Sequence, residues 1–134
     1  LLEAVRRGVD MFDCVIPTMY AQRNTVYTSE GKINLTSSAF RFSDDSLDAR
    51  CSCTTCLHYS VGYLHHLSKC KEPTGWRLLS IHNQFYYQSL MHQIRQAIEE
   101  DRFQELYDEI KGGWLVSANS NTSSEDSSLS TAEA

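Results

Sequence analysis

The stretch that organises this chain reads Cys51-Ser52-Cys53-Thr54-Thr55-Cys56, and His82 follows it after twenty-five intervening residues. Three thiolates and one imidazole complete the tetrahedral shell of a structural zinc ion. Because the protein fills all four positions, no site remains for a reactive water. The pattern therefore predicts a clamp between chain segments and places any chemistry elsewhere.

A disulfide scaffold is the alternative for these thiols. Cys-x-Cys-x-x-Cys does not easily satisfy disulfide geometry within itself, and the five cysteines of the chain leave an odd one over. The two remaining cysteines, Cys14 and Cys70, have no second ligand at a useful spacing and are expected to be buried thiols. The spacing favours zinc, bound through Cys51, Cys53, Cys56 and His82.

Composition describes an ordinary globular chain. It has 134 residues, of which 41% are hydrophobic and 22% charged, a length that suits one domain. No apolar run approaches a membrane span, and no signal peptide opens the chain. Clustered thiols without such a leader favour a reducing compartment, so we expect a cytoplasmic protein with no membrane partner. The chain begins at Leu1 without an initiator Met, and we expect it to be a piece of a longer polypeptide.

The net charge of -5 does not decide whether the partner is a nucleic acid. Three acidic residues lie in the tail after Trp114, where the chain has no Lys or Arg. Residues 1–114 are therefore nearer to neutral, and basic side chains such as Arg23 remain available for phosphate contacts. Scattered surface charge is the other interpretation of the same residues.

The first third of the chain predicts a helix, a strand and a hairpin. A helix over 1–7 is expected to turn at Gly8 into a short buried strand over 11–16, which Pro17 stops. Two short runs, 26–28 and 32–35, flank Ser29-Glu30-Gly31 and predict a β-hairpin with a glycine-containing loop.

The rest of the chain predicts helices and a disordered end. Apolar residues at three- and four-residue spacing predict an amphipathic helix over 57–69 and a long helix over 84–100 with Asn83 as its N-cap. A final helix begins near Phe103 and ends at Gly112-Gly113. From about Ser117 the composition is too poor in apolar side chains to offset the entropy of ordering, so disorder is expected.

Five motifs then occur along the chain in order. They are Arg6-Arg7-Gly8-Val9-Asp10-Met11-Phe12-Asp13-Cys14-Val15-Ile16-Pro17-Thr18, Thr28-Ser29-Glu30-Gly31, the cysteine cluster, Tyr63-Leu64-His65-His66-Leu67 and His82-Asn83. From about Leu2 to Ile110 they closely resemble the C-terminal part of queuine/preQ1-type tRNA-guanine transglycosylases. Such enzymes exchange guanine at the anticodon wobble position of tRNA for a 7-deazaguanine.

This resemblance implies an α/β fold class, the C-terminal portion of a TIM-type (β/α)8 barrel with a zinc-binding subdomain. A complete barrel needs about 250 residues, so more than half of it would be absent here. The implied parts are the end of the barrel with the nucleophile loop and hairpin (1–42), the zinc-binding subdomain (43–82), helices packing on the barrel (83–114) and a disordered tail (115–134).

The resemblance also implies a catalytic residue. The second Asp of the Asp-x-Phe-Asp-Cys motif is the nucleophile of the family and corresponds to Asp13. Breaking an N-glycosidic bond builds positive charge on the sugar, which a carboxylate can capture as a covalent intermediate. The alternative is that Asp13 caps a turn or pairs with an arginine. Asp10 is expected to have a structural role, because an odd offset on a strand points the two side chains to opposite faces.

One departure from the family concerns RNA recognition. Family members usually carry two arginines after the Pro-Thr pair, but Met19 and Gln22 stand at those positions here. Tyr20 could stack on a base and Arg23 could bind phosphate in their place, so these two residues are the candidate contacts to the tRNA anticodon loop.

An aromatic and histidine cluster follows the zinc motif. In the resembled family this region helps to form a homodimer interface, for which Tyr59, Tyr63 and His66 are the candidate anchors. The alternative is a partly buried helix face with satisfied polar tips.

Three functions from different classes remain. The first is a fragment of a transglycosylase that uses structural Zn²⁺ and acts on tRNA and a 7-deazaguanine base. The second is a noncatalytic subunit of a heteromeric transglycosylase, which the intact Asp13 motif disfavours. The third is a zinc-stabilised module that binds RNA or protein, which does not explain the motif upstream of the cysteines. The chain lacks the base-pocket residues that would separate preQ1 from queuine.

Overall fold

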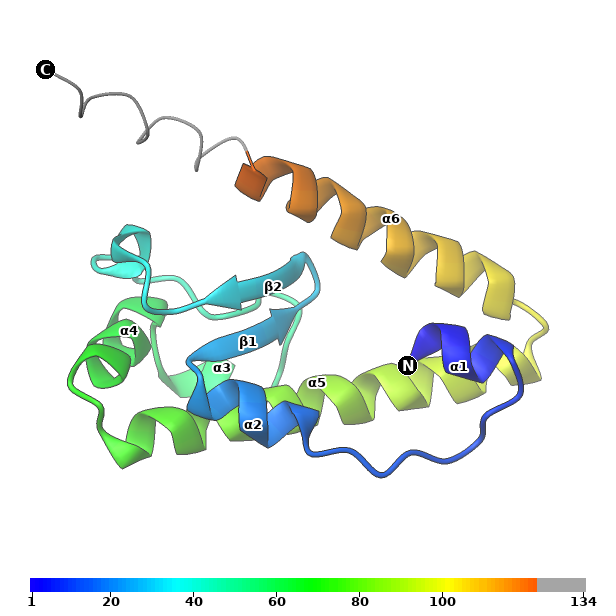
Figure 1. Cartoon of the computed structure of the whole chain (residues 1–134), viewed down its shortest axis with the longest axis horizontal. Coiled ribbons are helices and arrows are strands. Elements are labelled where there is room, and N and C mark those ends of the chain that lie inside the picture. Colours follow the sequence, from blue (N-terminus) through cyan, green and yellow to red (C-terminus); the bar gives the residue numbers. More distant parts are fainter. Residues whose placement is uncertain (123–134) are drawn as a thin grey trace, which may run out of the picture.

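Helices dominate the chain, and one short hairpin lies among them (Figure 1). The computed structural model describes the backbone of residues 1–122 and the side chains of residues 1–113. In chain order the elements are α1 (Leu2–Arg6), α2 (Ile16–Gln22), β1 (Thr25–Thr28), β2 (Gly31–Asn34), the 3₁₀ turn η1 (Ser38–Phe40), α3 (Thr54–His58), α4 (Val61–Lys69), α5 (Pro73–Glu99) and α6 (Phe103–Thr122).

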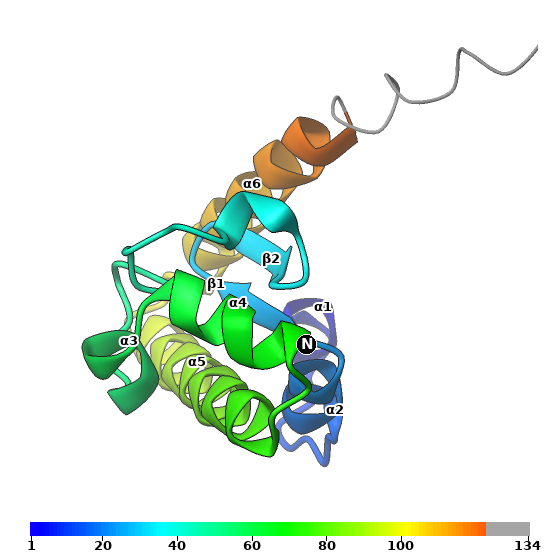
Figure 2. The same cartoon turned by 90° about the vertical axis from the view of Figure 1, so that its left-hand side faces the viewer.

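The longest helix, α5, is the element on which the others pack. Pro73 opens it in the first turn, where a proline loses no helical hydrogen bond and its fixed φ suits the helix. Helix α5 is therefore a single helix, and the prediction of a start at residue 84 with Asn83 as N-cap is wrong. Its buried stripe includes Leu79, Leu90 and Ile94. Figure 2 shows α3 and α4 beside its N-terminal half.

The predicted hairpin is confirmed. Strands β1 and β2 pair antiparallel from Thr25 opposite Asn34 to Thr28 opposite Gly31. Gly31 has a φ of 135°, which lies in the region that only glycine adopts without strain. The hairpin lies between α5 and α6, with β1 against α5 and β2 against α6 (Figure 1).

The buried core joins the hairpin to α4 and α5. Val26, Leu35, Leu64 and Leu79 are fully buried, and the thiols of the cysteine motif belong to the same cluster. Burying an aliphatic side chain of this size contributes about 1.5–3 kcal/mol. The metal ligands therefore lie at the edge of the core and not on a loose surface loop.

The expected buried strand over 11–16 is wrong for this chain. Residues 9–15 have no regular structure, α2 begins directly after them, and Met11 and Val15 are 88% and 69% exposed. A strand needs a neighbour to bind its backbone groups, and the two-stranded hairpin is the only sheet within residues 1–122. The barrel that the resemblance implies is accordingly not present in the part of the chain that the structure describes.

Two helix boundaries also differ from prediction. The expected helix over 57–69 is two helices, because the chain breaks at Tyr59 and Ser60 and the Ser60 hydroxyl accepts a hydrogen bond from the Tyr63 amide to begin α4. Helix α6 passes through Gly112 and Gly113 and ends at Thr122, so their assignment as a helix stop is wrong. The predicted disordered tail over 115–134 stays a prediction, and its residues 123–134 lie outside the described chain.

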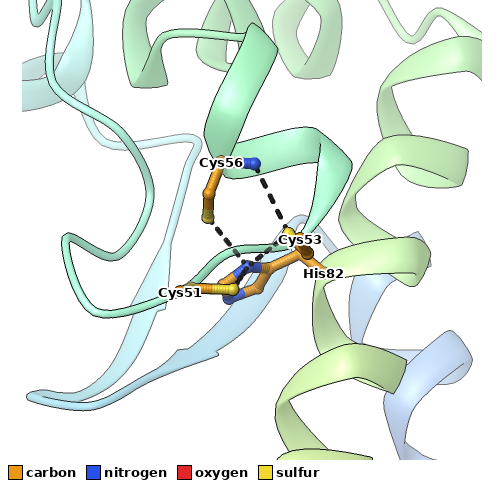
Figure 3. Close-up of side chains that lie close together, drawn as sticks. All are labelled: Cys51, Cys53, Cys56 and His82. Carbon is orange, nitrogen blue, oxygen red and sulfur yellow. Dashed lines mark hydrogen bonds between the residues drawn. The ribbon is translucent and has the colours of Figure 1, made fainter.

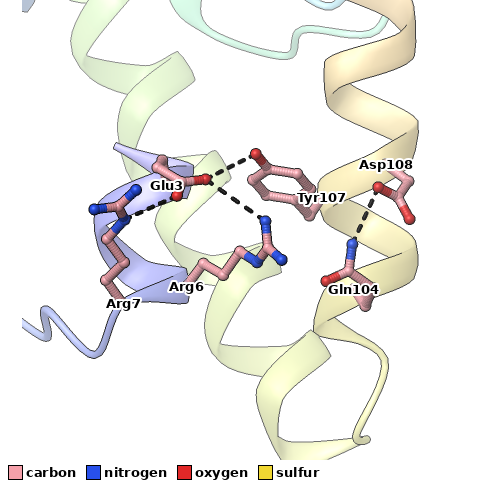
Figure 4. Close-up of polar contacts among 6 residues, drawn as sticks. All are labelled: Glu3, Arg6, Arg7, Gln104, Tyr107 and Asp108. Carbon is pink, nitrogen blue, oxygen red and sulfur yellow. Dashed lines mark hydrogen bonds and ion pairs between the residues drawn. The ribbon is translucent and has the colours of Figure 1, made fainter.

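Helix α1 is tied to α6 by polar contacts (Figure 4). The Glu3 carboxylate accepts hydrogen bonds from Arg7 Nε and from the Tyr107 hydroxyl, both at 2.9 Å. The bond from Arg7, followed by that from Tyr107, lowers the pKa of Glu3. On the same helix as Tyr107, Gln104 donates to Asp108 at 3.1 Å.

Among the described residues no helix is both long and apolar enough to cross a membrane.

Candidate metal centre

The four residues of the cysteine and histidine motif meet at one point (Figure 3). Their ligand atoms, three sulfurs and one ring nitrogen, lie within 4.8 Å of one another. The Nδ1 atom of His82 is 3.6 Å from the sulfurs of Cys51 and Cys53 and 3.3 Å from that of Cys56. Tetrahedral zinc bonded to sulfur at about 2.3 Å and to nitrogen at about 2.0 Å separates the nitrogen from each sulfur by about 3.5 Å. The geometry and the donor set fit a structural zinc ion.

The second ring nitrogen of His82 fixes the direction of the first. His82 is fully buried, and its Nε2 atom donates a 2.7 Å hydrogen bond to the backbone carbonyl of Tyr27 in β1. This bond holds the proton on Nε2 and leaves the Nδ1 lone pair facing the sulfurs, as a metal-binding histidine requires. Burial also lowers the pKa of His82, which favours the neutral form that binds zinc.

Two of the three thiols favour their protonated form when no cation is present. Burial is the main cause that raises the pKa of Cys51 and of Cys56 when no cation is present. A dication in the cluster reverses this preference, because it stabilises the thiolates that burial disfavours. Zinc binding therefore releases protons at this site.

Local structure explains how the cysteine motif turns. Cys53 is the N-cap of α3, and its sulfur accepts a hydrogen bond from the Cys56 amide at 3.4 Å, which brings two ligands together. The fully buried Thr55 donates its hydroxyl to the Leu78 carbonyl of α5 at 2.7 Å. Helix α3 is thus fixed to the helix that carries His82.

Asp48 joins the hairpin loop to the approach of the cysteine motif. Its buried carboxylate accepts hydrogen bonds from the Ser29 amide and hydroxyl at 2.6 and 2.9 Å and from the Arg50 amide at 2.9 Å. Its backbone carbonyl accepts from the Cys51 amide at 3.1 Å. Sequence analysis did not single out Asp48, whose role depends on a hairpin loop nineteen positions earlier.

Asp13, the predicted nucleophile, does not lie among the metal ligands. It is exposed in the irregular segment before α2, separated from the N-cap residue Val15 by Cys14. Cys14 is exposed, as is Cys70, so the prediction that both are buried thiols is wrong. Cys70 lies beside His66 at the end of α4, with the sulfur 3.7 Å from Nε2.

The two predicted RNA contacts lie at the C-terminal end of α2. Arg23 is exposed, whereas the half-buried ring of Tyr20 already has partners. It packs edge-on against Tyr27 at 5.6 Å, and the Lys32 ammonium lies 5.3 Å from its centre. Tyr20 and Lys32 therefore present an aromatic and cationic pair at this edge of the hairpin.

The predicted dimer anchors form an exposed aromatic surface. The rings of Tyr59 and Tyr63 stack at 5.7 Å, and they are 37% and 44% exposed. His66, one turn after Tyr63 on α4, is also exposed. In contrast, His65 turns inward and contacts the Leu35 carbonyl through Nδ1 at 2.6 Å.

Asn83 is the buried polar residue that sequence analysis misplaced. It is fully buried inside α5, and its side-chain amide forms hydrogen bonds with three backbone groups of α2 and β1. Its role is therefore to join these elements, not to cap a helix. One feature of the sequence could have indicated this role: Asn83 directly follows a predicted metal ligand, a position that favours burial, and a buried polar side chain needs hydrogen-bond partners.

Comparison with known proteins gives one consistent result. A family model described as queuine tRNA-ribosyltransferase matches residues 1–114. Similar curated proteins, each named queuine tRNA-ribosyltransferase, include those of Histophilus somni, 53% identical over 106 residues (79% of this chain, 28% of the relative), and Pasteurella multocida, 51% identical over 109 residues (81% and 28%). That of Leptospira biflexa is 48% identical over 111 residues (83% and 30%). The chain thus spans less than a third of the length of these curated relatives.

Proposed function

Because this chain belongs to the queuine tRNA-ribosyltransferase family, we propose that it is the C-terminal part of a tRNA-guanine transglycosylase. The whole enzyme exchanges guanine at the anticodon wobble position for a 7-deazaguanine, preQ1 or queuine, in queuosine biosynthesis. The observation that carries the proposal is that the matched region holds both a Cys3His zinc site and the Asp13 motif.

Asp13 is the proposed nucleophile. Its carboxylate oxygen attacks the ribose C1′ atom, the C1′–N9 bond to guanine breaks, and the bonding electrons leave with guanine, which is protonated by an acid elsewhere in the protein. A nitrogen of the incoming base then attacks C1′, and the C1′–O bond to Asp13 breaks so that its electrons return to the carboxylate. The nitrogen loses its proton to a base elsewhere in the protein. The exposure of Asp13 supports this role, because the group must reach a bulky RNA substrate.

The zinc ion is proposed to have a structural role. Its four protein ligands fill the tetrahedral shell and leave no open position for water or substrate. The ligands tie the chain before α3 to α5, so bound metal contributes folding free energy.

The remainder of the enzyme is proposed to complete a TIM-type barrel. The apolar side chains of Met11 and Val15 face solvent in this chain, which supports the idea that residues outside it cover them. The same barrel is proposed to supply the general acid, the general base and the base pocket.

Further proposals concern partners. Arg23 and the Tyr20–Lys32 pair are placed to meet the anticodon loop, and the exposed surface of Tyr59, Tyr63 and His66 supports a homodimer of the full-length enzyme. A tRNA substrate and free thiols agree with a cytoplasmic location.

The second candidate is a noncatalytic subunit of a heteromeric transglycosylase. Met19 and Gln22 favour it, since they replace the arginines expected at those positions. Under this alternative the full-length protein gains activity only when a catalytic partner is added.

Base exchange by the full-length protein tests the proposal. Wild type is expected to incorporate labelled guanine into tRNA and to form a covalent tRNA adduct that survives denaturant. Asp13→Asn is expected to lose the adduct and at least about 10³-fold in kcat while keeping zinc, because an amide is a poor nucleophile. The matched change Asp10→Asn is expected to retain both. An adduct that persists in Asp13→Asn assigns the chemistry to another residue.

A further inference from the structure

Adjacent side chains of α5 bind the outer edge of β1. The Nε2 atom of His82 donates to the Tyr27 carbonyl at 2.7 Å, and the Oδ1 atom of Asn83 accepts from the Tyr27 amide at 3.1 Å. Both polar backbone groups of one strand residue are therefore satisfied by two consecutive helix residues. One of the two is a metal ligand, and the other is not.

The amide nitrogen of Asn83 reaches a third element. Its two protons go to the Thr25 carbonyl of β1 at 3.0 Å and to the Pro17 carbonyl in the first turn of α2 at 2.9 Å. With its oxygen on Tyr27, the buried amide group uses both donors and its acceptor. A single side chain thus connects α5, β1 and α2.

The contact to Pro17 fixes the helix that follows the proposed nucleophile. Val15, the N-cap of α2, accepts hydrogen bonds from the Met19 amide and the Thr18 hydroxyl at 2.9 and 3.1 Å. Only Cys14 separates that N-cap from Asp13. A shift of Pro17 is therefore transmitted through one short turn to the Asp13 backbone.

Helix α2 packs on α5 and β1, but its first turn is only partly covered. Its apolar residue Ala21 is fully buried, but Ile16, Pro17 and Thr18 are only partly covered, and Val15 is exposed. A hydrogen bond to a buried amide is strong because the low dielectric around the amide favours it. The Asn83 bond is accordingly the defined polar anchor at this end of α2.

We propose that Asn83 is a positioning residue that couples the order of the zinc site to the Asp13 segment. Zinc fixes the His82 ring, α5 carries Asn83 rigidly beside it, and the Asn83 amide holds Pro17 and thereby the backbone that presents Asp13. Loss of zinc frees the His82 ring and so loosens the contacts that Asn83 makes with β1 and α2. The catalytic part of this inference rests on the proposed role of Asp13, whereas the mechanical part does not.

Amide hydrogen exchange of the full-length protein tests the mechanical coupling. In wild type, chelation of zinc is expected to raise the amide exchange rate about tenfold or more both in α3 and in α2. A change of this size corresponds to the loss of about one buried hydrogen bond. In Asn83→Leu, which keeps the branched shape but removes the hydrogen bonds, α2 exchange is expected to be raised already with zinc bound. Chelation then adds little in α2 but still loosens α3.

Two variants and a control keep the test decisive. Asn83→Ala is less demanding on packing and admits water, so it serves if Asn83→Leu fails to fold. Gln96→Ala removes an amide from the exposed face of the same helix and is expected to match wild type in zinc content and exchange. A wild-type protein whose α2 exchange ignores zinc removal overturns the proposal without any variant. A variant that still shows the full wild-type response in α2 also overturns it.

Kinetics separate positioning from support of the fold. For zinc-loaded Asn83→Ala at saturating tRNA, kcat for base exchange is expected to fall about 10- to 100-fold, because the nucleophile is displaced. KM for tRNA is expected to rise as well, because α2 also carries the proposed RNA contact Tyr20. Equal kcat in the variant and wild type overturns the positioning role. If wild type itself has no exchange activity, the proposed function fails, and hydrogen exchange still decides the coupling.

Discussion

His82 Nε2 lies 2.7 Å from the Tyr27 carbonyl oxygen, so one imidazole joins the metal site to the hairpin. The two ring nitrogens have different partners, since Nδ1 faces the three sulfurs and Nε2 donates its hydrogen bond to β1. The zinc ion therefore stabilises more than the cysteine loop. It holds the strand edge against α5 through its only nitrogen ligand.

Replacing Cys53 is expected to release the metal. Cys53→Ser removes a buried thiolate that is also the N-cap of α3, so zinc content should fall well below one per chain and α3 should lose protection. Elemental analysis of the purified full-length variant measures this. Cys70→Ser is the control, because Cys70 is exposed and outside the cluster, and it should retain zinc. Full zinc occupancy in Cys53→Ser would contradict the ligand assignment.

The metal-free protein is expected to be most stable near neutral pH. Burial lowers the pKa of His82 below 6.5, so the unfolded chain takes up this proton first and stability falls as the pH drops below that value. Burial raises the pKa of Cys51 above 9.0, so the unfolded chain loses this proton first and stability falls as the pH rises above that value. Thermal unfolding of the chelated protein from about pH 5 to about pH 10 measures both limits. A flat profile would show that the site opens when metal leaves.

The metal ligands were predictable because ligand type and spacing are local chemistry. Cys51, Cys53 and Cys56 lie close in sequence, and a buried imidazole was the missing fourth donor. The orientation of His82 was not predictable, because it depends on Tyr27, which the hairpin brings to α5 from fifty-five positions away. Sequence spacing specifies which groups bind a metal, whereas tertiary packing specifies how they are aimed.

The errors in the fold have similar causes. The apolar periodicity predicts a long helix from residue 84, whereas α5 begins eleven positions earlier at Pro73, a residue that also favours turns, and only packing decides between the two. The apolar run around Met11 has the composition of a buried strand, but a strand forms only where a neighbour binds its backbone. Hairpin residues 25–34 carry their own partner, so their prediction succeeded.

Two glycines are expected to respond oppositely to alanine. A Cβ at Gly62 would lie 2.8 Å from the Ser43 carbonyl oxygen, which the Gly62 amide already binds, so the backbone has no room to move. Gly62→Ala should cost about 1–3 kcal/mol of unfolding free energy. A Cβ at Gly112 meets nothing within 4 Å and lies inside α6, so Gly112→Ala should stabilise by about 0.5–1 kcal/mol. Chemical denaturation measures the free energy of unfolding of both variants. If Gly62→Ala were as stable as wild type, the close packing of α4 on the backbone of Ser43 would be refuted.

Removal of the Asp48 carboxylate is expected to loosen the link between the hairpin and the cysteine motif. Asp48→Ala leaves the backbone amides of Ser29 and Arg50 without an acceptor, because both donate to this buried carboxylate. Hydrogen bonds to a charged acceptor are each worth about 1.5–3 kcal/mol, so the variant should lose at least about 2 kcal/mol. Ser29→Ala is the matched control, because it removes only the hydroxyl bond and should cost less, about 1.5 kcal/mol.

The same variant is expected to release zinc faster. The Asp48 backbone carbonyl binds the Cys51 amide, and its side chain fixes the intervening turn, so this ligand loses its support when the carboxylate is removed. Transfer of zinc to a chromogenic chelator should be at least about tenfold faster for Asp48→Ala than for Ser29→Ala, because an unfixed ligand dissociates more often. Equal transfer rates in the two variants would mean that Asp48 holds the hairpin alone and that the metal ligands are positioned by α3 and α5.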